Sequence, residues 1–259
     1  MTYQTLQLDR QGTVLTISLN RPEALNSMNG TMIEELTECF TALHEDQETQ
    51  IVVLKGEGRA FSAGGDIKAM LANDGSFEIE DVMSKLEKLA HAYYTLPKLT
   101  IAAVHGAAAG LGFSLVLASD FILAEKNAKL AMNFIGIALV PDGGGHFFLK
   151  ERVGVPKAKQ LIWEGKMMTG EEAHEVALVG HLTEDGGLQA GVEMLVAKLK
   201  QAPLDAMLET KSILHGTKEQ ELQAVLRAEA VSQTKMRSAS NHLEGIDAFV
   251  SKRKPQFNQ

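Results

Sequence analysis

Two short apolar runs, each leading into a glycine-rich turn, constrain the fold of this chain more than any other feature. The first run is Ile51-Val52-Val53-Leu54, and the turn Gly64-Gly65-Asp66 follows it. The second run is Ile101-Ala102-Ala103-Val104, and residues 105–112, with three glycines, follow it. Both runs predict buried strands. Strand–helix alternation continues to about Gly186 and is followed by helical patterns alone, which predicts an α/β core with a helical tail.

The two glycine turns also indicate a function. Backbone N–H groups in such turns can point outward at a developing negative charge. Two turns that each open a helix can supply one N–H apiece to a single oxygen atom, which is the arrangement of an oxyanion hole. The alternative is structural. Gly64-Gly65-Asp66 alone is more typical of an ordinary turn, and Gly110-Leu111-Gly112 can serve close packing of a helix on a strand.

The amino-acid composition and net charge limit the kind of protein this can be and the kinds of molecule it can bind. Of the 259 residues, 45% are hydrophobic and 22% charged, as in soluble globular proteins. We expect a core over residues 1–186 and a helical region over residues 187–259. The formal net charge of −8 provides no basic stripe for nucleic acid. The single cysteine, Cys39, excludes a disulfide framework and is expected to be buried. Since neither a leader nor a membrane-spanning run is evident, we expect a cytoplasmic protein without a membrane partner.

Local patterns predict several elements. Apolar alternation on either side of Arg10-Gln11-Gly12 predicts an N-terminal hairpin. The apolar residues Ile33, Leu36, Phe40 and Leu43, in 3-4-3 spacing, predict a helix that Asn29 or Thr31 caps. Residues 130–138 are apolar and expected to be extended. Residues 69–84 are polar, which favours a surface loop, with a substrate-adapting lid as the alternative.

Motifs spread over the whole chain resemble those of the enoyl-CoA hydratase/isomerase (crotonase) superfamily. The matching pieces are Asn20-Arg21-Pro22-Glu23-Ala24-Leu25-Asn26, Ala60-Phe61-Ser62-Ala63-Gly64-Gly65-Asp66-Ile67, Ala102-Ala103-Val104-His105-Gly106, Pro141-Asp142-Gly143-Gly144-Gly145 and the tail from Phe249 to Phe257. The resemblance implies an α/β ClpP/crotonase-like spiral of ββα repeats with a C-terminal helical trimerisation region. It implies a homotrimer or a dimer of trimers, an acyl-CoA substrate, and no cofactor beyond the coenzyme A of that substrate. No metal site is expected.

The resemblance also assigns site residues. It puts the oxyanion donors at the N–H groups of Ala63 and Leu111, the latter where the family usually has glycine. It places two groups of residues along the substrate. Expected along the acyl-CoA are Gly64, Gly65, Asp66, Ile67, Gly110 and Phe134, and expected against the coenzyme A moiety are Ala24, Leu25, Lys254 and Phe257.

The resemblance further implies which reactions the chain has lost. Hydratases of the family use two glutamates, and here those positions hold Ser114 and Phe134. Neither side chain does acid–base work at ordinary pH. The one carboxylate at a family catalytic position is Asp142, as in dienoyl-CoA isomerases, ring-opening epoxide isomerases and 4-chlorobenzoyl-CoA dehalogenase. The local pattern alone favours a helix cap for Asp142.

The sequence therefore predicts an isomerase that shifts a double bond in an unsaturated acyl-CoA through an enolate, in fatty-acid or aromatic-acid metabolism. A dehalogenase-like reaction is disfavoured because Glu87 stands at the catalytic-histidine position of that enzyme. Two competing functions are enoyl-CoA hydration and the binding of acyl-CoA without catalysis. Should Asp142 be only a cap, Glu87 is the next candidate base.

Overall fold

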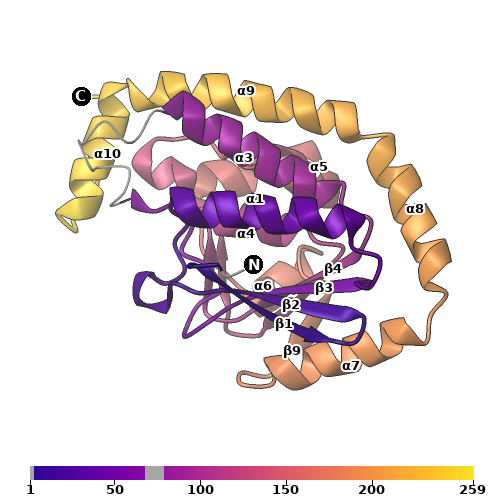
Figure 1. Cartoon of the computed structure of the whole chain (residues 1–259). Helices are drawn as coiled ribbons and strands as arrows, with labels where there is room; N and C mark the ends of the chain where they lie inside the picture. Colours follow the sequence, from indigo (N-terminus) through magenta and orange to yellow (C-terminus); the bar gives the residue numbers. More distant parts are fainter. Residues whose placement is uncertain (1–2, 68–78) are drawn as a thin grey trace.

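A computed structural model describes residues 3–67 and 79–259. Its centre is a six-stranded sheet in the order β1-β2-β3-β4-β6-β9 (Figure 1). The strands are β1 (Leu6–Gln11), β2 (Val14–Leu19), β3 (Ile51–Gly56), β4 (Leu99–Val104), β6 (Phe121–Glu125) and β9 (His181–Thr183). The β1–β2 pair is antiparallel and forms the predicted hairpin, whereas all other neighbours are parallel. Both predicted strands, β3 and β4, are confirmed as adjacent members of this sheet.

The central strands β3 and β4 are buried on both faces, as strands of parallel sheets are. Successive residues of a strand point to opposite faces. Val52 and Leu54 of β3 therefore face one hydrophobic cluster, and Ile51 and Val53 face another. The first cluster is filled by helices α1 (Gly30–Glu45), α3 (Ile79–Tyr94) and α4 (Leu111–Ala118), and the second by α7 (Leu188–Lys200). Figure 1 shows α1 and α3 on one side of the sheet and α7 on the other.

A small second sheet and its neighbours carry the rest of the core. It has the order β5-β7-β8. Its strands are β5 (Ala107–Ala109), β7 (Lys129–Ala131) and β8 (Met168–Thr169). Within residues 3–67 and 79–259 the core also contains η1 (Pro22–Ala24), η2 (Asn133–Ile137), α5 (Gly145–Glu164) and α6 (Gly170–Glu175).

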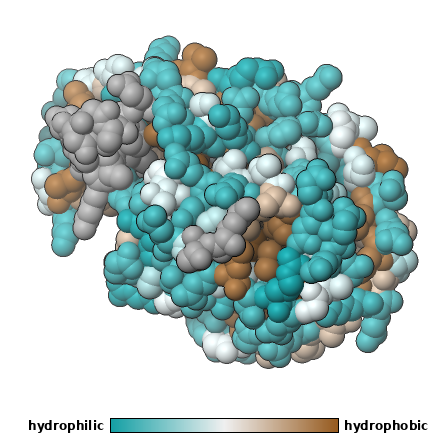
Figure 2. Space-filling model, in the orientation of Figure 1, coloured by the Kyte–Doolittle hydropathy of each residue, from teal (hydrophilic) through white to brown (hydrophobic). Residues whose placement is uncertain are grey.

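The C-terminal helices run around the outside of the core. After α7 come α8 (Leu204–Gly216), α9 (Glu219–Arg237) and α10 (Ser240–Val250). In Figure 1 they pass from below the sheet, up one side and across the top, where α9 lies over α3. They leave large apolar side chains exposed, namely Met194, Ile213, Leu214, Val231, Leu243, Phe249 and Val250. On the face drawn in Figure 2 hydrophobic residues form separate patches within a mostly hydrophilic surface.

Most local predictions are confirmed, with one correction. Asn29 caps α1 by accepting from the N–H of Met32, and Cys39 is buried. The extended segment predicted over residues 130–138 is wrong beyond β7, because the chain turns there into η2. An apolar run of this length does not by itself separate a strand from a short helix. Of the predicted loop or lid, residues 79–84 belong to α3 and residues 69–78 lie outside the described part of the chain.

No helix within residues 3–67 and 79–259 combines the length and apolar character that crossing a bilayer requires.

Candidate active site

Backbone pairing brings the two glycine turns together. The N–H of Ser62 donates to the carbonyl oxygen of Ala107 at 2.9 Å, and the N–H of Ala109 donates back to Ser62 at 3.0 Å. Gly64 lies beside this bridge with φ +97, and a Cβ there would be 2.7 Å from the carbonyl oxygen of Ala109. Only glycine fits such a close approach at positive φ. The two predicted buried strands thus deliver their turns to one place.

The N–H donors differ from the sequence prediction at one position. The prediction for Ala63 is wrong, because its N–H donates to the carbonyl oxygen of Leu25 at 2.9 Å. Gly65, two residues on, lies on the cavity wall, and its N–H has no acceptor among the described residues. The N–H of Leu111 is in the first turn of α4, where N–H groups have no intrahelical acceptor. Gly65 and Leu111 therefore both line the cavity and carry N–H groups with no acceptor among the described residues.

An ion pair holds the first turn against the preceding loop. Arg21 Nη1 lies 2.9 Å from Asp66 Oδ2 and donates to the carbonyl oxygen of Ser27 at 2.6 Å. Asn26, fully buried, donates to the carbonyl oxygens of Glu57 and Ala60, each at 2.8 Å. These bonds explain why the Asn20–Asn26 motif and the glycine turn occur together. Asp66 lines the cavity, as predicted, but its carboxylate is engaged by arginine.

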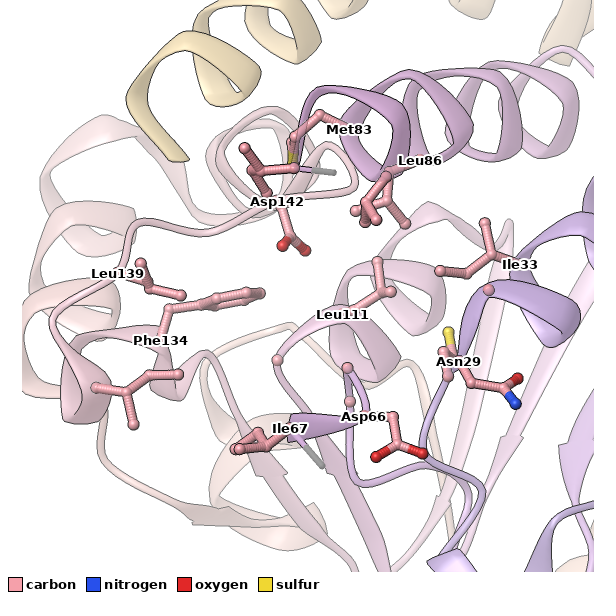
Figure 3. A pocket seen from close by; sticks show the side chains of 18 of the residues that line it. Asn29, Ile33, Asp66, Ile67, Met83, Leu86, Leu111, Phe134, Leu139 and Asp142 are labelled. Carbon is pink, nitrogen blue, oxygen red and sulfur yellow. The ribbon is translucent and has the colours of Figure 1, made fainter. Parts of the chain in front are cut away.

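The turns open into a cavity of about 420 Å³ between α1, α3, α4 and η2. Figure 3 shows the Asp142 carboxylate pointing into it, between Phe134 on one side and Leu86 on the other. Its wall is mainly apolar. The apolar side chains that line it include Ile33, Ile79, Val82, Met83, Leu86, Leu111, Phe134, Ile137, Leu139 and Phe249. A cavity of this size and character fits an acyl chain.

Asp142 is the buried acid of this cavity. It is 7% exposed, and the pKa of its carboxyl is raised from 3.8 to about 8, mainly by burial. The nearby Glu229 carboxylate contributes to this rise in pKa, whereas Arg237 opposes it. Oδ2 accepts from Nε2 of Gln233 at 3.2 Å, and Oδ1 has no hydrogen-bond partner among the described residues. The cap interpretation fails, because Gly144 is the N-cap of α5 and makes no side-chain cap bond.

The two positions of the missing glutamates have different roles here. Ser114 is fully buried, and its Oγ donates to the backbone oxygen of Asp142 at 2.8 Å. This bond holds the loop that carries Asp142 against α4. Leu111 supports the same loop, since a Cβ added to Gly143 would lie 2.5 Å from its Cδ1. Phe134 lines the cavity with an apolar ring. Neither Ser114 nor Phe134 brings a carboxylate to the cavity.

The structure brings most of the predicted residues together. Ala63, Gly64, Gly65, Asp66, Ile67, Gly110, Leu111, Phe134 and Asp142 all line the cavity. The predicted coenzyme A contacts Ala24, Leu25, Lys254 and Phe257 do not line it, and neither does Glu87. The lysine is exposed and the other three contacts are part-buried.

Sequence reasoning missed residues that arrive from distant helices. Arg237 of α9 and Phe249 of α10 line the cavity. Ile33 was predicted only as the apolar face of a helix, and Met83 and Leu86 were not singled out. The 3-4 apolar spacing of α1 and α3 was available as a signal for burial, but nothing local distinguishes burial in a core from burial against a cavity.

Comparisons with known proteins agree with this geometry. The chain matches the enoyl-CoA hydratase/isomerase family over residues 9–259. It is 46% identical over 246 residues to YhaR of Bacillus subtilis (strain 168), which carries an enoyl-CoA hydratase/isomerase name, with 95% of this chain and 96% of the relative covered. It is 32% identical over 248 residues to the 1,2-epoxyphenylacetyl-CoA isomerase of Escherichia coli (strain K12), covering 94% of each.

Solved structures lead to the same conclusion. The crystal structure of an enoyl-CoA hydratase from Mycobacterium avium subsp. paratuberculosis K-10 matches with a TM-score of 0.89 at 28% identity, covering 100% of both chains. The predicted crotonase fold is thereby confirmed. Together with the family match and the two relatives, this shows that the chain belongs to the enoyl-CoA hydratase/isomerase family.

Proposed function

We propose that this protein shifts a double bond in an unsaturated acyl-CoA, with Asp142 as the single acid–base group. The observation that carries the proposal is the Asp142 carboxyl itself. It is buried at the apolar cavity, its Oδ1 has no partner among the described residues, and its pKa is raised to about 8. A raised pKa suits a residue that must both take and return a proton near neutral pH.

The reaction needs an oxyanion site and one base. The thioester oxygen accepts from the N–H groups of Gly65 and Leu111, and each such donor typically contributes ~10²–10³ in rate. The ionised Asp142 takes a proton from Cα of a 3-enoyl thioester, and the electron pair moves into a dienolate on that oxygen. The protonated Asp142 then returns the proton to Cγ. The product is the 2-enoyl thioester, and the carboxylate is regenerated.

The dipole of α4 favours the enolate. Its first turn carries the N–H of Leu111, and the positive end of a helix stabilises nearby negative charge. The apolar wall excludes water, which strengthens these interactions. No cofactor beyond the coenzyme A of the substrate takes part in this scheme.

Hydration is the less favoured reaction, although relatives carry both hydratase and isomerase names. Addition of water needs a group that activates the water molecule and a second group that handles the Cα proton. The hydroxyl of Ser114 donates its hydrogen bond to the backbone oxygen of Asp142, and the side chain of Phe134 has no proton to exchange. A 1,2-epoxyphenylacetyl-CoA isomerase among the relatives at 32% identity supports a proton-moving reaction without added water.

Replacement of Asp142 tests the proposal. Asp142→Asn keeps the shape of the side chain and removes the base, so turnover of trans-3-hexenoyl-CoA should fall about 10²–10⁴-fold. Acyl-CoA affinity should stay nearly unchanged, because the oxyanion donors are main-chain groups. Absorbance of the conjugated 2-enoyl thioester measures turnover, and deuterium uptake from solvent at Cα measures proton abstraction.

The matched control is Asp205→Asn, the same change at an exposed position of α8. It should leave turnover and exchange at wild-type values. If Asp142→Asn still isomerises and exchanges at near wild-type rates, Asp142 is not the base. If the wild-type protein binds acyl-CoA tightly but turns over no 3-enoyl, 2-enoyl or dienoyl thioester, it is a binding protein and the proposal fails.

A further inference from the structure

Two side chains of helix α9, one helical turn apart, form hydrogen bonds with the loop that carries Asp142. Glu229 is 2% exposed and Gln233 is fully buried, although both are polar. Long polar side chains are seldom fully buried unless they have specific partners. Both find their partners in residues 140–146.

Glu229 binds the backbone that follows Asp142. One carboxylate oxygen accepts from the N–H of Gly144 at 2.8 Å. The other accepts from the backbone N–H of His146 at 3.1 Å and lies 2.8 Å from its Nδ1. These N–H groups belong to the start of α5, where a carboxylate satisfies free donors and complements the helix dipole. Glu229 thus fixes the backbone of the loop.

Gln233 binds the side chain of Asp142 itself. Its Nε2 donates to the backbone oxygen of Val140 at 2.6 Å and to Oδ2 of Asp142 at 3.2 Å. The bond to Val140 fixes the orientation of the amide, since only the nitrogen can donate to a carbonyl oxygen. Oδ1 of Asp142 has no partner among the described residues. The two oxygens of the carboxyl are therefore not equivalent.

We propose that Gln233 is a positioning residue for Asp142, held to it by the hydrogen bond to Oδ2. This inference rests on the proposed function. Gln233 is not among the residues that line the cavity, so it acts through Asp142 and not by touching the acyl chain. Its bond to Oδ2 stabilises the ionised carboxyl and stops its rotation. The carboxyl then keeps the orientation in which Asp142 lines the cavity.

The charged and titratable groups around Asp142 are not altered when Gln233 is changed. They are Glu229 and Arg237 on α9, His146 on α5, and Asp66, Asp81 and Lys85 across the cavity. Asp66 is paired with Arg21, and Asp81 is paired with Lys85. A substitution at position 233 therefore reports on the two hydrogen bonds of Gln233, to Oδ2 and to the backbone oxygen of Val140.

The test is the pH profile of Gln233→Met, which keeps the length of the side chain and removes its donor. Loss of a hydrogen bond to a charged group should raise the Asp142 pKa by about one unit. The ionised fraction near pH 7, and with it kcat for trans-3-hexenoyl-CoA, should then fall about tenfold. Much of kcat should return above about pH 9, because the carboxyl ionises there. KM should change less than about twofold.

Gln220→Met is the matched control, because Gln220 is exposed on the same helix. It should keep the wild-type kcat and pH midpoint. A second variant, Gln233→Glu, is nearly isosteric and places a like charge beside Asp142, so the midpoint should rise more than in Gln233→Met. This variant keeps the proposal testable if the methionine variant does not fold.

A purely structural role for Gln233 predicts something different, namely a lower thermal stability and a kcat reduced equally at every pH. That result, or a wild-type profile in both Gln233 variants, overturns the proposal while the proposed function stands. Titration of the carboxyl by ¹³C NMR without substrate, assigned with Asp142→Asn, gives the pKa directly. If Asp142→Asn itself turns over normally, the proposed function fails, and the titration still decides whether Gln233 holds Asp142.

Discussion

Replacement of Asp142 by asparagine should change how the stability of the protein depends on pH, whatever reaction it catalyses. The native carboxyl has a pKa of about 8, against 3.8 for an unperturbed one. The folded state therefore binds this proton more tightly than the unfolded state. Its contribution to stability is fully present below about pH 4 and is lost as the pH rises through about 8. The asparagine variant has no such proton to lose.

The size of the effect follows from the same pKa difference. Between about pH 4 and pH 8 the wild type should lose about 1.4 kcal/mol per pH unit relative to the variant. The whole difference is on the order of 5 kcal/mol, and between about pH 5 and pH 7 it is about 3 kcal/mol. Asparagine keeps the bond from Gln233, because its Oδ1 can accept from Nε2 of Gln233 where Asp142 Oδ2 does.

Urea unfolding followed by circular dichroism at a series of pH values measures this difference. Wild type and variant are compared at equal protein concentration, since assembly contributes to apparent stability. Other titrating groups cancel in the difference between the two proteins. A free-energy difference that stays flat between about pH 5 and pH 8 would refute the claim that Asp142 is buried with a raised pKa.

Three further predictions are open to simple measurements. Crotonyl-CoA hydration should be absent or very slow because Ser114 and Phe134 replace the two glutamates; rapid loss of enoyl-thioester absorbance that site mutations abolish would contradict this. The protein should be a homotrimer or a pair of trimers that covers exposed side chains such as Ile213 and Leu243, which are 65% and 66% exposed; a monomeric mass by light scattering would oppose it. Asp66→Asn weakens the pair with Arg21, so kcat should fall about tenfold with little change in KM, as the Gly65 turn loosens; an unchanged kcat would count against that role.

The fold was largely predictable because its signals are local. The apolar run at Ile51 and its counterpart at Ile101 are each followed by glycines that only a sharp turn requires, and both became neighbouring strands. The cap at Asn29 depends on the three residues that follow it. Residues 133–137 were mispredicted because the same apolar residues suit a strand and a short helix.

The site was predictable only where one motif contains it. Asp142 stands in a loop whose sequence marks it, and its carboxylate points into the cavity. The donor at Ala63 was misassigned because its N–H donates to the carbonyl oxygen of Leu25. These two residues are 38 positions apart, so no local sequence pattern contains the contact. Gln233 meets Asp142 across 91 positions, so its role appears only when α9 is placed in space.

The hydrogen bonds between α9 and the loop that carries Asp142 have a consequence for how the protein folds during its synthesis. Gly144 receives its acceptor from Glu229, 85 positions later in the chain. During synthesis the sheet and both glycine turns leave the ribosome well before α9 does. Contacts so distant along the chain are costly to close and form late. A nascent or truncated chain that ends before Glu229 can pair its strands, yet it leaves the Gly144 and His146 N–H groups without their acceptor. The loop that carries Asp142 gains these two hydrogen bonds only when the last helices have been made and docked.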